Sequence, residues 1–342
     1  MKKLLLASAF VLVSNQAHGQ ESPAPVSEIT SAEAQKLIED DKAVWSIVWE
    51  NDIFSGTDKN YSNGARIAWN SAEANAPDWL RWSADWLPIN NEGNKRISAA
   101  LGQNIYTPED KTLAAPNPQD RPYAGWLYGS VGISSDTGKV LDNVMLTLGV
   151  VGPSALGEQT QDFVHDAIDD DIAQGWDNQL EDEPGFILSY ERKWRSMAEW
   201  SPFGLGADVT PHVGFNLGNV NTSANAGATL RIGYDLPQDY GPPRIRPSLP
   251  GSDFFVPEQA IGGYLFATVE GRGVARDIFL DGNTFKDSPS VDKENFVGSL
   301  NLGVALTIEE TRISYTHAFL TEEFETQREP QQFGIVSVSH RF

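Results

Sequence analysis

The 342-residue sequence contains no cysteine. Disulfide bonds and thiolate metal sites are therefore excluded, and the fold has to be stabilised by a hydrophobic core or by a closed sheet. Two familiar hydrolytic motifs are also missing, since neither the GxSxG nucleophile elbow nor the HExxH zinc motif occurs. Hydrolytic chemistry of those two types is not expected.

Long hydrophobic runs are absent beyond the N-terminus. The first residues, MKKLLLASAFVLVSNQAHG, combine two lysines, an apolar stretch over residues 4–13 and small residues at 17 and 19. This pattern predicts a signal peptide over residues 1–19, followed by a polar leader over residues 20–42. No run reaches the roughly 18 apolar residues that a transmembrane helix requires. The exported chain is therefore expected to be either soluble or a β-barrel.

Positive charge is scarce. Lys and Arg number 25 against 47 Asp and Glu, which gives a formal net charge of −22. A surface this acidic argues against nucleic acid as a partner, because the phosphates would be repelled. It fits a protein that binds divalent cations or one that lies in a cation-rich, polyanionic layer.

The sequence does contain alternation with a period of two residues, which is typical of strands. Between residues 139 and 151, Val144, Leu146 and Leu148 share one face, whereas Asn143 and Thr147 share the other. Twelve segments are predicted to be strands, several of them with clean alternation. They are residues 43–52, 60–70, 96–107, 123–135, 139–151, 184–196, 206–217, 222–235, 262–279, 294–309, 311–321 and 331–342.

Two fold classes fit this pattern, a large soluble β-sandwich and a transmembrane β-barrel. The even number of strands, a last strand that ends on Phe342 and aromatic residues near strand ends all favour the barrel. The aromatic residues that could form an interfacial girdle are Trp45, Trp49, Trp69, Tyr106, Tyr123, Trp126, Trp194 and Trp200. We therefore predict an all-β fold over residues 43–342, a twelve-stranded antiparallel transmembrane barrel with a short helix in an extracellular loop.

The links between the strands indicate the orientation of the barrel. With both termini in the periplasm, the long polar links 53–59, 108–122 and 152–183 would lie outside the cell, and short turns would lie inside. Residues 196–202 are interpreted as one of these short turns. The Pro-rich link 236–261 departs from the pattern. Either the strand count is wrong nearby, or the barrel has an unusual periplasmic loop.

Small polar side chains crowd the stretch WENDIFSGTDKNYSNGARIAWN, residues 49–70. A turn between two strands needs two or three such residues, and this stretch has more. Asp52 and Ser62 offer hard oxygen ligands, which suit Ca²⁺ better than a softer metal. The alternative is an ordinary hairpin rich in Asn and Asp. From the alternation of the flanking strands, Asp52, Ser62 and Arg66 are expected to face inward.

The long link 152–183 is expected to contain a helix that ends at Gly175. His165 lies in this helix, with Asp162 three residues before it and Asp169 four residues after it, on the same face. A histidine beside a carboxylate can act as a general base that the acid orients. The alternative is a solvated histidine on an acidic helix.

Over nearly the whole mature chain, the sequence resembles the outer-membrane lipid A 3′-O-deacylases. The segments that carry the resemblance are ENDIF at 50–54, YSNG at 61–64, GQNIYTP at 102–108, DRPYAG at 120–125, GPSALGEQTQDFVH at 152–165 and GWDNQLEDEPG at 175–185. The resemblance implies a Ca²⁺-dependent, twelve-stranded barrel in the bacterial outer membrane. It also implies removal of an ester-linked 3′-acyloxyacyl chain from lipid A, the lipid part of lipopolysaccharide.

The resemblance further implies the roles of individual residues. The family's Asn-Asp pair, strand hydroxyl and helix histidine fall on Asn51, Asp52, Ser62 and His165. The hydroxyl is a serine here, where better-studied relatives have threonine. An acid six residues after the histidine would be Asp171, although Asp169 is the closer helical neighbour. His165 would then activate a water molecule, and Asp52 would hold Ca²⁺.

Lipid A carries phosphates, which cationic side chains are expected to bind. The candidates by predicted position are Arg66, Lys111 and Arg121. Two other functions stay open: a porin-like or structural barrel that binds cations at an acidic rim, and an outer-membrane phospholipase. The expected partners are lipid A and other outer-membrane lipids, and the protein is expected to be a monomer.

Overall fold

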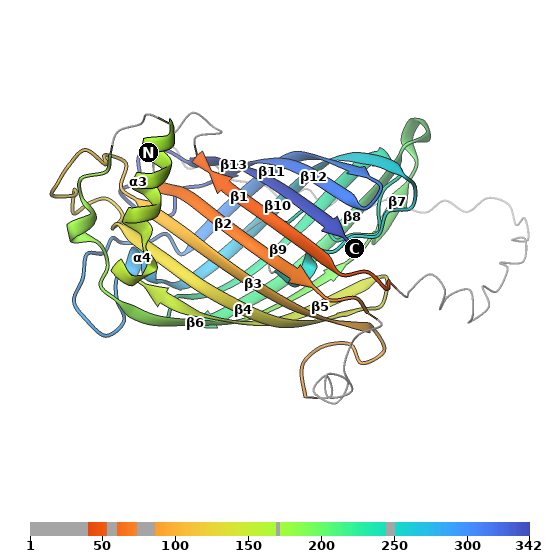
Figure 1. Cartoon of the computed structure of the whole chain (residues 1–342), viewed down its shortest axis with the longest axis horizontal. Coiled ribbons are helices and arrows are strands. Elements are labelled where there is room, and N and C mark those ends of the chain that lie inside the picture. Colours follow the sequence, from red (N-terminus) through yellow and green to blue (C-terminus); the bar gives the residue numbers. More distant parts are fainter. Residues whose placement is uncertain (1–39, 53–59, 74–85, 169–171, 244–249) are drawn as a thin grey trace, which may run out of the picture. The chain divides into compact units, whose positions relative to one another are not determined.

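The computed structural model describes residues 40–52, 60–73, 86–168, 172–243 and 250–342. The predicted signal peptide over residues 1–19 and most of the leader lie outside these residues. One antiparallel sheet forms the wall of the described part (Figure 1). Its long strands are β1 (Val44–Asn51), β2 (Asn60–Asn70), β3 (Asn94–Thr107), β4 (Ala124–Asp136), β5 (Val140–Val151), β6 (Glu183–Trp194), β8 (Gly206–Gly218), β9 (Asn221–Tyr234), β10 (Ile261–Asp277), β11 (Phe296–Ile308), β12 (Thr311–Leu320) and β13 (Gln331–Arg341).

The sheet closes into a barrel because β1 pairs with β13 and β6 pairs with β8. The short strand β7 (Ala198–Trp200) pairs with β8 beyond the point where β6 stops, so it continues the same position in the wall. The wall therefore has twelve strands, and the predicted fold is confirmed. Residues 196–202, predicted to be only a short turn, instead contain β7 and the start of the 3₁₀ helix η4 (Pro202–Gly204).

Helical segments lie in the links between strands. The β5–β6 link contains η2 (Pro153–Ala155), α3 (Gly157–Ile168) and η3 (Trp176–Asn178), the β9–β10 link contains η5 (Pro250–Ser252), and the β10–β11 link contains α4 (Ile278–Asp281). No helix in the described residues has both the length and the apolar composition needed to cross a membrane. Ala43 and Phe342 pair through their backbones at one end of the barrel. We call this the termini end and the opposite end, which carries α3, the distal rim.

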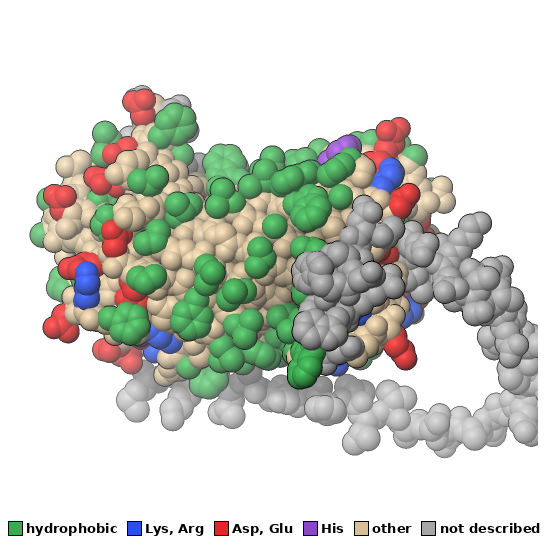
Figure 2. Space-filling view, turned by 60° about the horizontal axis from the view of Figure 1, so that its bottom comes forward, with side chains coloured by type: hydrophobic (Ala, Val, Ile, Leu, Met, Phe, Trp, Pro, Cys, Tyr) green, Lys and Arg blue, Asp and Glu red, His purple; other side chains and the backbone are tan. Residues whose placement is uncertain are grey.

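The outward face of the wall is apolar. Ile47, Val131 and Leu265 point away from the lumen, and each leaves about 60% of its surface exposed. Figure 2 shows hydrophobic side chains over the middle of the wall and charged side chains towards its two ends. This distribution matches a hydrocarbon layer around the middle of the barrel and water at both rims.

The inward face of the wall is polar, as the alternation predicts. Inward hydroxyl groups of neighbouring strands pair with each other, for example Ser46 with Ser339 at 2.8 Å and Thr229 with Thr268 at 2.8 Å. Each pair satisfies two hydroxyl groups that water cannot reach. The lumen is therefore lined by side chains that bond across the strands.

The predicted aromatic girdle is only partly correct. Trp45, Trp49 and Trp200 face outward and remain about half exposed. Tyr106 and Trp126 are instead buried: Tyr106 stacks on Phe279 of α4 at 4.0 Å between ring centroids, and Trp126 stacks on Tyr128. Tyr123 is also buried, beneath the β5–β6 link. These three aromatic side chains pack inside the protein and cannot anchor it at a lipid interface.

The Pro-rich link between β9 and β10 folds back into the lumen. Its buried segment Ser252–Phe255 meets inward side chains of several strands. Asp253 forms an ion pair with Arg66 of β2 at 2.7 Å, and the ring of Phe254 lies 4.6 Å beneath the guanidinium of Arg96. The strand count was therefore right, and the link is unusual because it fills the termini end of the lumen. We call the described part of this link, residues 235–243 and 250–260, the lumen plug.

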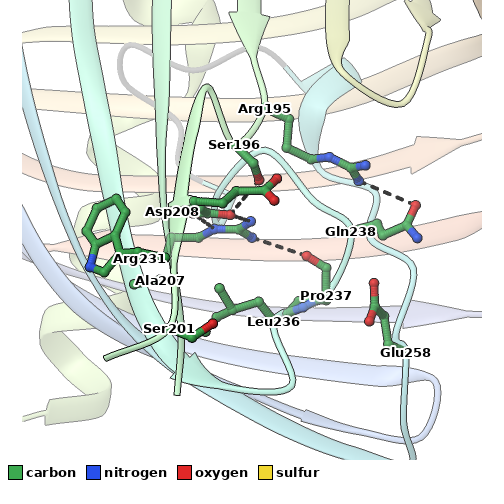
Figure 3. A pocket seen from close by; sticks show the side chains of 13 residues that line it. Arg195, Ser196, Ser201, Ala207, Asp208, Arg231, Leu236, Pro237, Gln238 and Glu258 are labelled. Carbon is green, nitrogen blue, oxygen red and sulfur yellow. Dashed lines mark hydrogen bonds and ion pairs between the residues drawn. The ribbon is translucent and has the colours of Figure 1, made fainter. Parts of the chain in front are cut away.

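Buried charges hold the lumen plug on the side of β8, β9 and β12. Arg231 of β9 bonds to Asp208 of β8, to Asp239 and to the carbonyl oxygen of Pro237. Figure 3 shows Arg231 between Asp208 and Pro237, at the edge of a pocket that opens beside Arg195 and Glu258. Arg312 of β12 also binds Asp239, at 2.6 Å. Because a buried charge is stable only when it is paired, these contacts fix the position of the plug.

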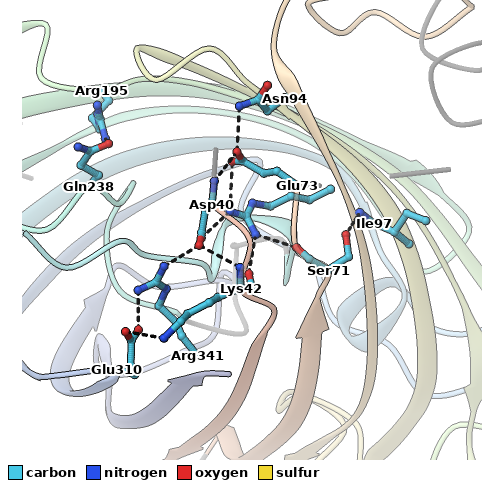
Figure 4. Close-up of polar contacts among 11 residues, drawn as sticks. Asp40, Lys42, Ser71, Glu73, Asn94, Ile97, Arg195, Gln238, Glu310 and Arg341 are labelled. Atoms are coloured by element: carbon cyan, nitrogen blue, oxygen red, sulfur yellow. Dashed lines mark hydrogen bonds and ion pairs between the residues drawn. The ribbon is translucent and has the colours of Figure 1, made fainter. Parts of the chain in front are cut away.

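A second group of charges closes the termini end around Asp40 (Figure 4). The Asp40 carboxylate accepts hydrogen bonds from Arg96 at 2.7 Å and from Arg341 at 2.6 Å. Glu310, in the turn between β11 and β12, binds Lys42 at 2.7 Å and Arg341. Residues 40–42, which were predicted to end the leader, are thus bound to the barrel.

Candidate active site

Helix α3 places His165 against the barrel wall. Gly157, Gln161 and His165 are spaced four residues apart, so they form one stripe along the helix. All three are buried, and His165 is only 4% exposed. The opposite face carries Phe163, which is 76% exposed, and the exposed Asp166. His165 is therefore not a solvated surface histidine, which was the alternative that the sequence left open.

Two glycines let the helix lie close to the wall. A Cβ atom added to Gly125 of β4 would come within 3.1 Å of the Ala155 side chain, and one added to Gly157 would come within 2.8 Å of the Trp176 ring. Gly125 has the outward orientation in β4, as do the exposed Gly129 and Val131. The loop therefore covers the outside of the wall at the distal rim. It does not close over the lumen.

A buried aromatic cluster packs against the same buried stripe of the helix. Trp176 of η3 packs with Ile105, Tyr123 and Ala173, and its ring centroid lies 5.0 Å from that of Tyr123. The indole N–H of Trp176 donates a hydrogen bond to Oε1 of Gln161 at 2.8 Å. This bond joins the η3 segment to the buried stripe of α3, one helical turn before His165.

Tyr123 links the same cluster to the β3–β4 link. Its hydroxyl donates to the carbonyl oxygen of Lys111 at 3.3 Å, and the same oxygen accepts from the backbone N–H of Gln174 at 2.9 Å. Burial raises the pKa of Tyr123 to about 12, although a backbone hydrogen bond at Gly175 opposes the shift. Tyr123 is thus neutral at physiological pH and acts as a packing group.

The end of β1 contributes a second group of polar side chains. Trp49 donates its indole N–H to Oδ1 of Asn63 at 2.7 Å, and Asn51 donates its amide to the same oxygen at 3.4 Å. Trp49 faces outward, so Asn51 and Asn63 belong to the outer face as well. Asp52 follows directly and is fully buried. Alternation no longer applies to Asp52, because the strand ends at Asn51.

The course of the loop brings α3 towards β1. The segment η2 contacts β4 and β5, whereas α3 contacts β3 and β4. The chain therefore crosses the outer wall in the direction β5 to β3, and β2 and β1 come next. His165 lies eight residues after Gly157, about 12 Å along the helix at 1.5 Å per residue. Adjacent strands are about 4.8 Å apart, so a distance of about 12 Å spans two to three strands of the wall.

The cationic side chains predicted to bind phosphate have different surroundings. Arg66 lies in the lumen and is bonded to Asp253. Arg121 is buried at the mouth of the lumen, 3.4 Å from Glu323 and 5.0 Å above the ring of Tyr106. Lys111 is half exposed, in the link tied to Gln174 near the end of α3. Of the three, Lys111 is the one on the outer side beside the helix.

Three predicted site residues cannot be placed. Asp169 and Asp171 lie outside the described residues, and so does the side chain of Ser62. The backbone at Ser62 is described, and the pairing of β2 with β3 shifts register between Tyr61 and Asn63. Such a bulge re-aims a side chain and is frequent beside active sites. The predicted roles of these three residues stay predictions.

A calcium site needs several oxygen ligands close together. No three His, Cys, Asp or Glu side chains in the described ranges lie close enough together to bind a metal ion. The donors near the end of β1 are the Asp52 carboxylate and the Asn51 and Asn63 amides, all of which offer oxygen. Ca²⁺ takes oxygen ligands of these kinds, together with backbone carbonyls and water. The chemistry of these donors fits Ca²⁺, for which Asp52 would be the carboxylate ligand.

Sequence reasoning missed Gln161 and Trp176, which fix the stripe of α3. The sequence feature that could have predicted this stripe is the four-residue spacing of Gly157, Gln161 and His165. A glycine, an amide and an imidazole on one stripe indicate a helix face that lies close to another surface.

Known proteins resemble this chain in sequence and in fold. A family model described as "Outer membrane protein LpxR" matches residues 4–342. The structure of LpxR from Salmonella typhimurium aligns with a TM-score of 0.70 and 20% identity, covering 87% of this chain and 100% of that one. The beta domain of the Bordetella autotransporter BrkA aligns with a TM-score of 0.44 and 11% identity, covering 88% of this chain and 99% of that one. No curated protein matched the sequence. Since the family model covers nearly the whole chain, the protein belongs to the LpxR family of outer-membrane proteins.

Proposed function

We propose that this protein is a Ca²⁺-dependent hydrolase that removes the ester-linked 3′-acyloxyacyl chain from lipid A in the outer leaflet of the outer membrane. The observation that carries the proposal is the position of His165. It is buried on the face of α3 that lies against the outer wall, at the distal rim. A lipid in the surrounding leaflet would lie beside this helix, on the membrane side of the wall.

The wall beside α3 suits the acyl chains of such a substrate. Trp49, Ile67 and Leu101 face outward on β1, β2 and β3, and each is between 42% and 58% exposed. An acyl chain that lies along these side chains would bring its ester end towards the polar residues at the ends of the same strands. Lys111 is the cationic side chain best situated for a lipid A phosphate.

In the proposed reaction His165 acts as a general base. It takes a proton from a water molecule while the water oxygen attacks the ester carbonyl carbon. The carbon–oxygen bond to the sugar then breaks, and the proton passes from His165 to the leaving sugar oxygen. The products are a free acid and a sugar hydroxyl group. No acyl-enzyme is formed.

The negative charge that develops on the carbonyl oxygen has to be stabilised. When bound at Asp52, Ca²⁺ supplies positive charge beside that oxygen. Asn51 and Ser62 support Asp52 in this role. An acid at Asp169 or Asp171 would orient the imidazole of His165.

A passive porin is the weaker alternative. The lumen plug fills the termini end of the barrel with bonded side chains, such as Asp253 on Arg66 and Phe254 under Arg96. A diffusion pore needs an open lumen. A phospholipase with the same base and the same cation is the second alternative. Only the lipid that is hydrolysed distinguishes it from a lipid A deacylase.

Mass spectrometry of lipid A from cells with and without the protein tests the proposal. We expect lipid A to lose the mass of one acyloxyacyl chain when the wild-type protein is present and to keep it with His165→Gln. A parallel assay with purified protein in detergent offers lipid A and phosphatidylethanolamine separately. Release of fatty acid from the phospholipid alone would replace the lipid A deacylase with a phospholipase. Unchanged lipids in both assays would leave the passive barrel as the better account.

A further inference from the structure

A pocket of about 360 Å³ lies at the termini end, between the β6–β8 link and the lumen plug (Figure 3). Its volume is at the lower end of the range for ligand pockets in proteins. The link contributes Arg195, and the plug contributes Gln238 and Glu258. Because α3 lies at the distal rim, this pocket is separate from the proposed active site.

Arg195 brings a positive charge to the pocket that no carboxylate neutralises. Arg231 and Arg341, at the same end of the barrel, are each ion-paired with an aspartate. Among the described residues, no carboxylate lies within ion-pairing distance of Arg195. Its guanidinium donates one long hydrogen bond to Oε1 of Gln238, at 3.4 Å, and lies 5.9 Å from the ring centroid of Tyr240. The remaining N–H groups of Arg195 are therefore available to a ligand.

Glu258 brings an unpaired negative charge to the same pocket. Its side chain is exposed and has no ion-pair partner in the described ranges. The two other carboxylates of the pocket differ, since Asp208 pairs with Arg231 and Glu199 pairs with Lys139. The pocket thus offers one positive and one negative group that do not neutralise each other.

Backbone hydrogen bonds fix both sides of the pocket. Gln238 and Val256 exchange two of them, at 2.9 and 3.0 Å, and Glu258 follows two residues later. On the other side, the backbone N–H of Arg195 donates to the carbonyl oxygen of Lys139 at 2.8 Å. In Figure 3, Gln238 lies between Arg195 and Glu258. Its oxygen is bonded to Arg195, which leaves its Nε2 hydrogen atoms for a ligand.

We propose that this pocket binds a zwitterion of the size of a dipeptide. The carboxylate of the ligand accepts hydrogen bonds from Arg195, and its ammonium group binds the carboxylate of Glu258. The amide oxygen between the two charges accepts a hydrogen bond from Nε2 of Gln238. A ligand with only one charge would leave Arg195 or Glu258 unpaired. The site takes part in no covalent step and is independent of the deacylase reaction.

Isothermal titration calorimetry of the purified protein in a non-ionic detergent tests the proposal, with L-alanyl-L-alanine as the probe. Acetylation of the probe removes its ammonium group, and amidation removes its carboxylate. We expect each blocked probe to bind at least about tenfold more weakly, because a charge-assisted hydrogen bond is lost. Phosphoethanolamine, the headgroup of a zwitterionic phospholipid, carries both charges but no amide for Gln238, so it should bind more weakly than L-alanyl-L-alanine.

Two variants show which side chain recognises which charge. Arg195→Gln should bind the probe and its amide equally and still prefer the probe over its acetyl form. Glu258→Gln should show the converse. Glu199→Gln is the matched control, because this carboxylate lines the same pocket but is paired with Lys139, so its affinities should stay within about twofold of wild type. The midpoint of urea unfolding checks that each variant is folded.

Three outcomes would overturn the proposal. The first is the absence of binding heat at probe concentrations of about 10 mM, or blocked probes that bind as tightly as L-alanyl-L-alanine. The second is tighter binding of phosphoethanolamine, which would assign the pocket to a phospholipid headgroup. The third is unchanged discrimination in both Arg195→Gln and Glu258→Gln, which would place the binding site elsewhere. The expected discrimination, lost selectively in each variant, supports the proposal.

Discussion

The lumen and the outer face at α3 both bury polar side chains, but they satisfy them differently. In the lumen, Asp239 is bound by Arg231, by Arg312 at 2.6 Å and by the hydroxyl of Tyr264 at 2.8 Å. At the outer face, Gln161 uses its oxygen on Trp176 and leaves its Nε2 donor without a partner among the described residues. The lumen is rich in ion pairs, whereas the buried stripe of α3 carries an amide and an imidazole.

On this comparison, the density of buried charge does not coincide with the proposed site. Removing charged groups from water costs several kcal/mol per ion, so the lumen charges have to be paired to exist at all. Their pairing holds the lumen plug against the strands and leaves little for a ligand. The following predictions test this division.

The largest effect is expected from His165. His165→Gln keeps a polar side chain of similar size, but glutamine cannot accept a proton near neutral pH. Because a general base contributes about 10²–10⁴-fold to the rate, deacylation of lipid A should fall by that factor or more. The measurement is fatty acid release from lipid A by the purified protein in detergent. The variant should unfold in urea at the wild-type midpoint, because α3 lies outside the sheet. Deacylation at the wild-type rate would require a different base.

The next effect concerns the proposed cation at Asp52. Chelation with EGTA should abolish deacylation, and added Ca²⁺ should restore it, whereas Mg²⁺, which demands a stricter octahedral site, should restore less. Asp52→Asn keeps the shape of the side chain but removes its charge, so the Ca²⁺ concentration needed for half-maximal activity should rise at least tenfold. The folded barrel should persist, because its strands bond to each other without the ion. Full activity of the chelated wild-type protein would remove the metal from the mechanism.

A substitution in the lumen is expected to lower the stability of the barrel and to leave its activity nearly unchanged. Asp239→Asn leaves the buried Arg231 and Arg312 without their shared carboxylate, and such a loss destabilises a protein by about 3–5 kcal/mol. We expect the midpoint of urea unfolding, followed by tryptophan fluorescence in detergent, to fall while kcat at low denaturant stays within about twofold of wild type. The control is Glu199→Gln at the same end of the barrel. Its pair with Lys139 is more than half exposed, so the change should stay below about 1 kcal/mol. If Asp239→Asn instead has normal stability and a lower kcat, the lumen takes part in catalysis, and the assignment of catalysis to the outer face is wrong.

The sequence predicted the wall well, because the wall follows a local rule. In β5, Leu146 and Leu148 face outward and Thr147 is buried, as the alternation predicts. The same rule could not place the lumen plug, since residues 236–261 have no periodicity. Asp253, Phe254 and Phe255 find their partners on strands that are far apart in the sequence. Contacts of this kind are set by closure of the barrel, which no local pattern encodes.

The candidate site was only partly predictable from the sequence. His165 was singled out from its flanking acids and from the family resemblance, but its burial against the outer wall follows from Gly125 and Gly157, which let the loop come close. Gln161 was missed because a glutamine in an acidic helix ordinarily faces water. Its partner Trp176 lies fifteen residues later and reaches it only when the loop folds back.

The smallest effect is expected from Glu310, a partly exposed residue at the termini end of the barrel. Burial by itself would raise the pKa of Glu310, but the hydrogen bond from Lys42 and the charges of Arg341 and Lys42 outweigh it and hold the pKa below 4.5. A carboxyl group whose folded pKa is depressed stabilises the protein above its unfolded pKa, and this contribution is lost as the pH falls through the folded value. About a third of the Glu310 side chain is exposed, so solvent screening limits the contribution to about 0.2–1 kcal/mol.

Glu310→Gln should therefore unfold slightly more easily than wild type at pH 7, and the gap between the two urea midpoints should close as the pH falls below 4.5. Lys42→Gln supplies the control. In the double variant with Glu310→Gln the two losses should not add, because both substitutions remove the same ion pair. The gap should also shrink in high salt, which screens a half-exposed pair but has little effect on the buried carboxylates of the lumen. If the gap persists unchanged below the folded pKa, the Glu310 charge is not its cause, and shape or packing at the β11–β12 turn must account for it.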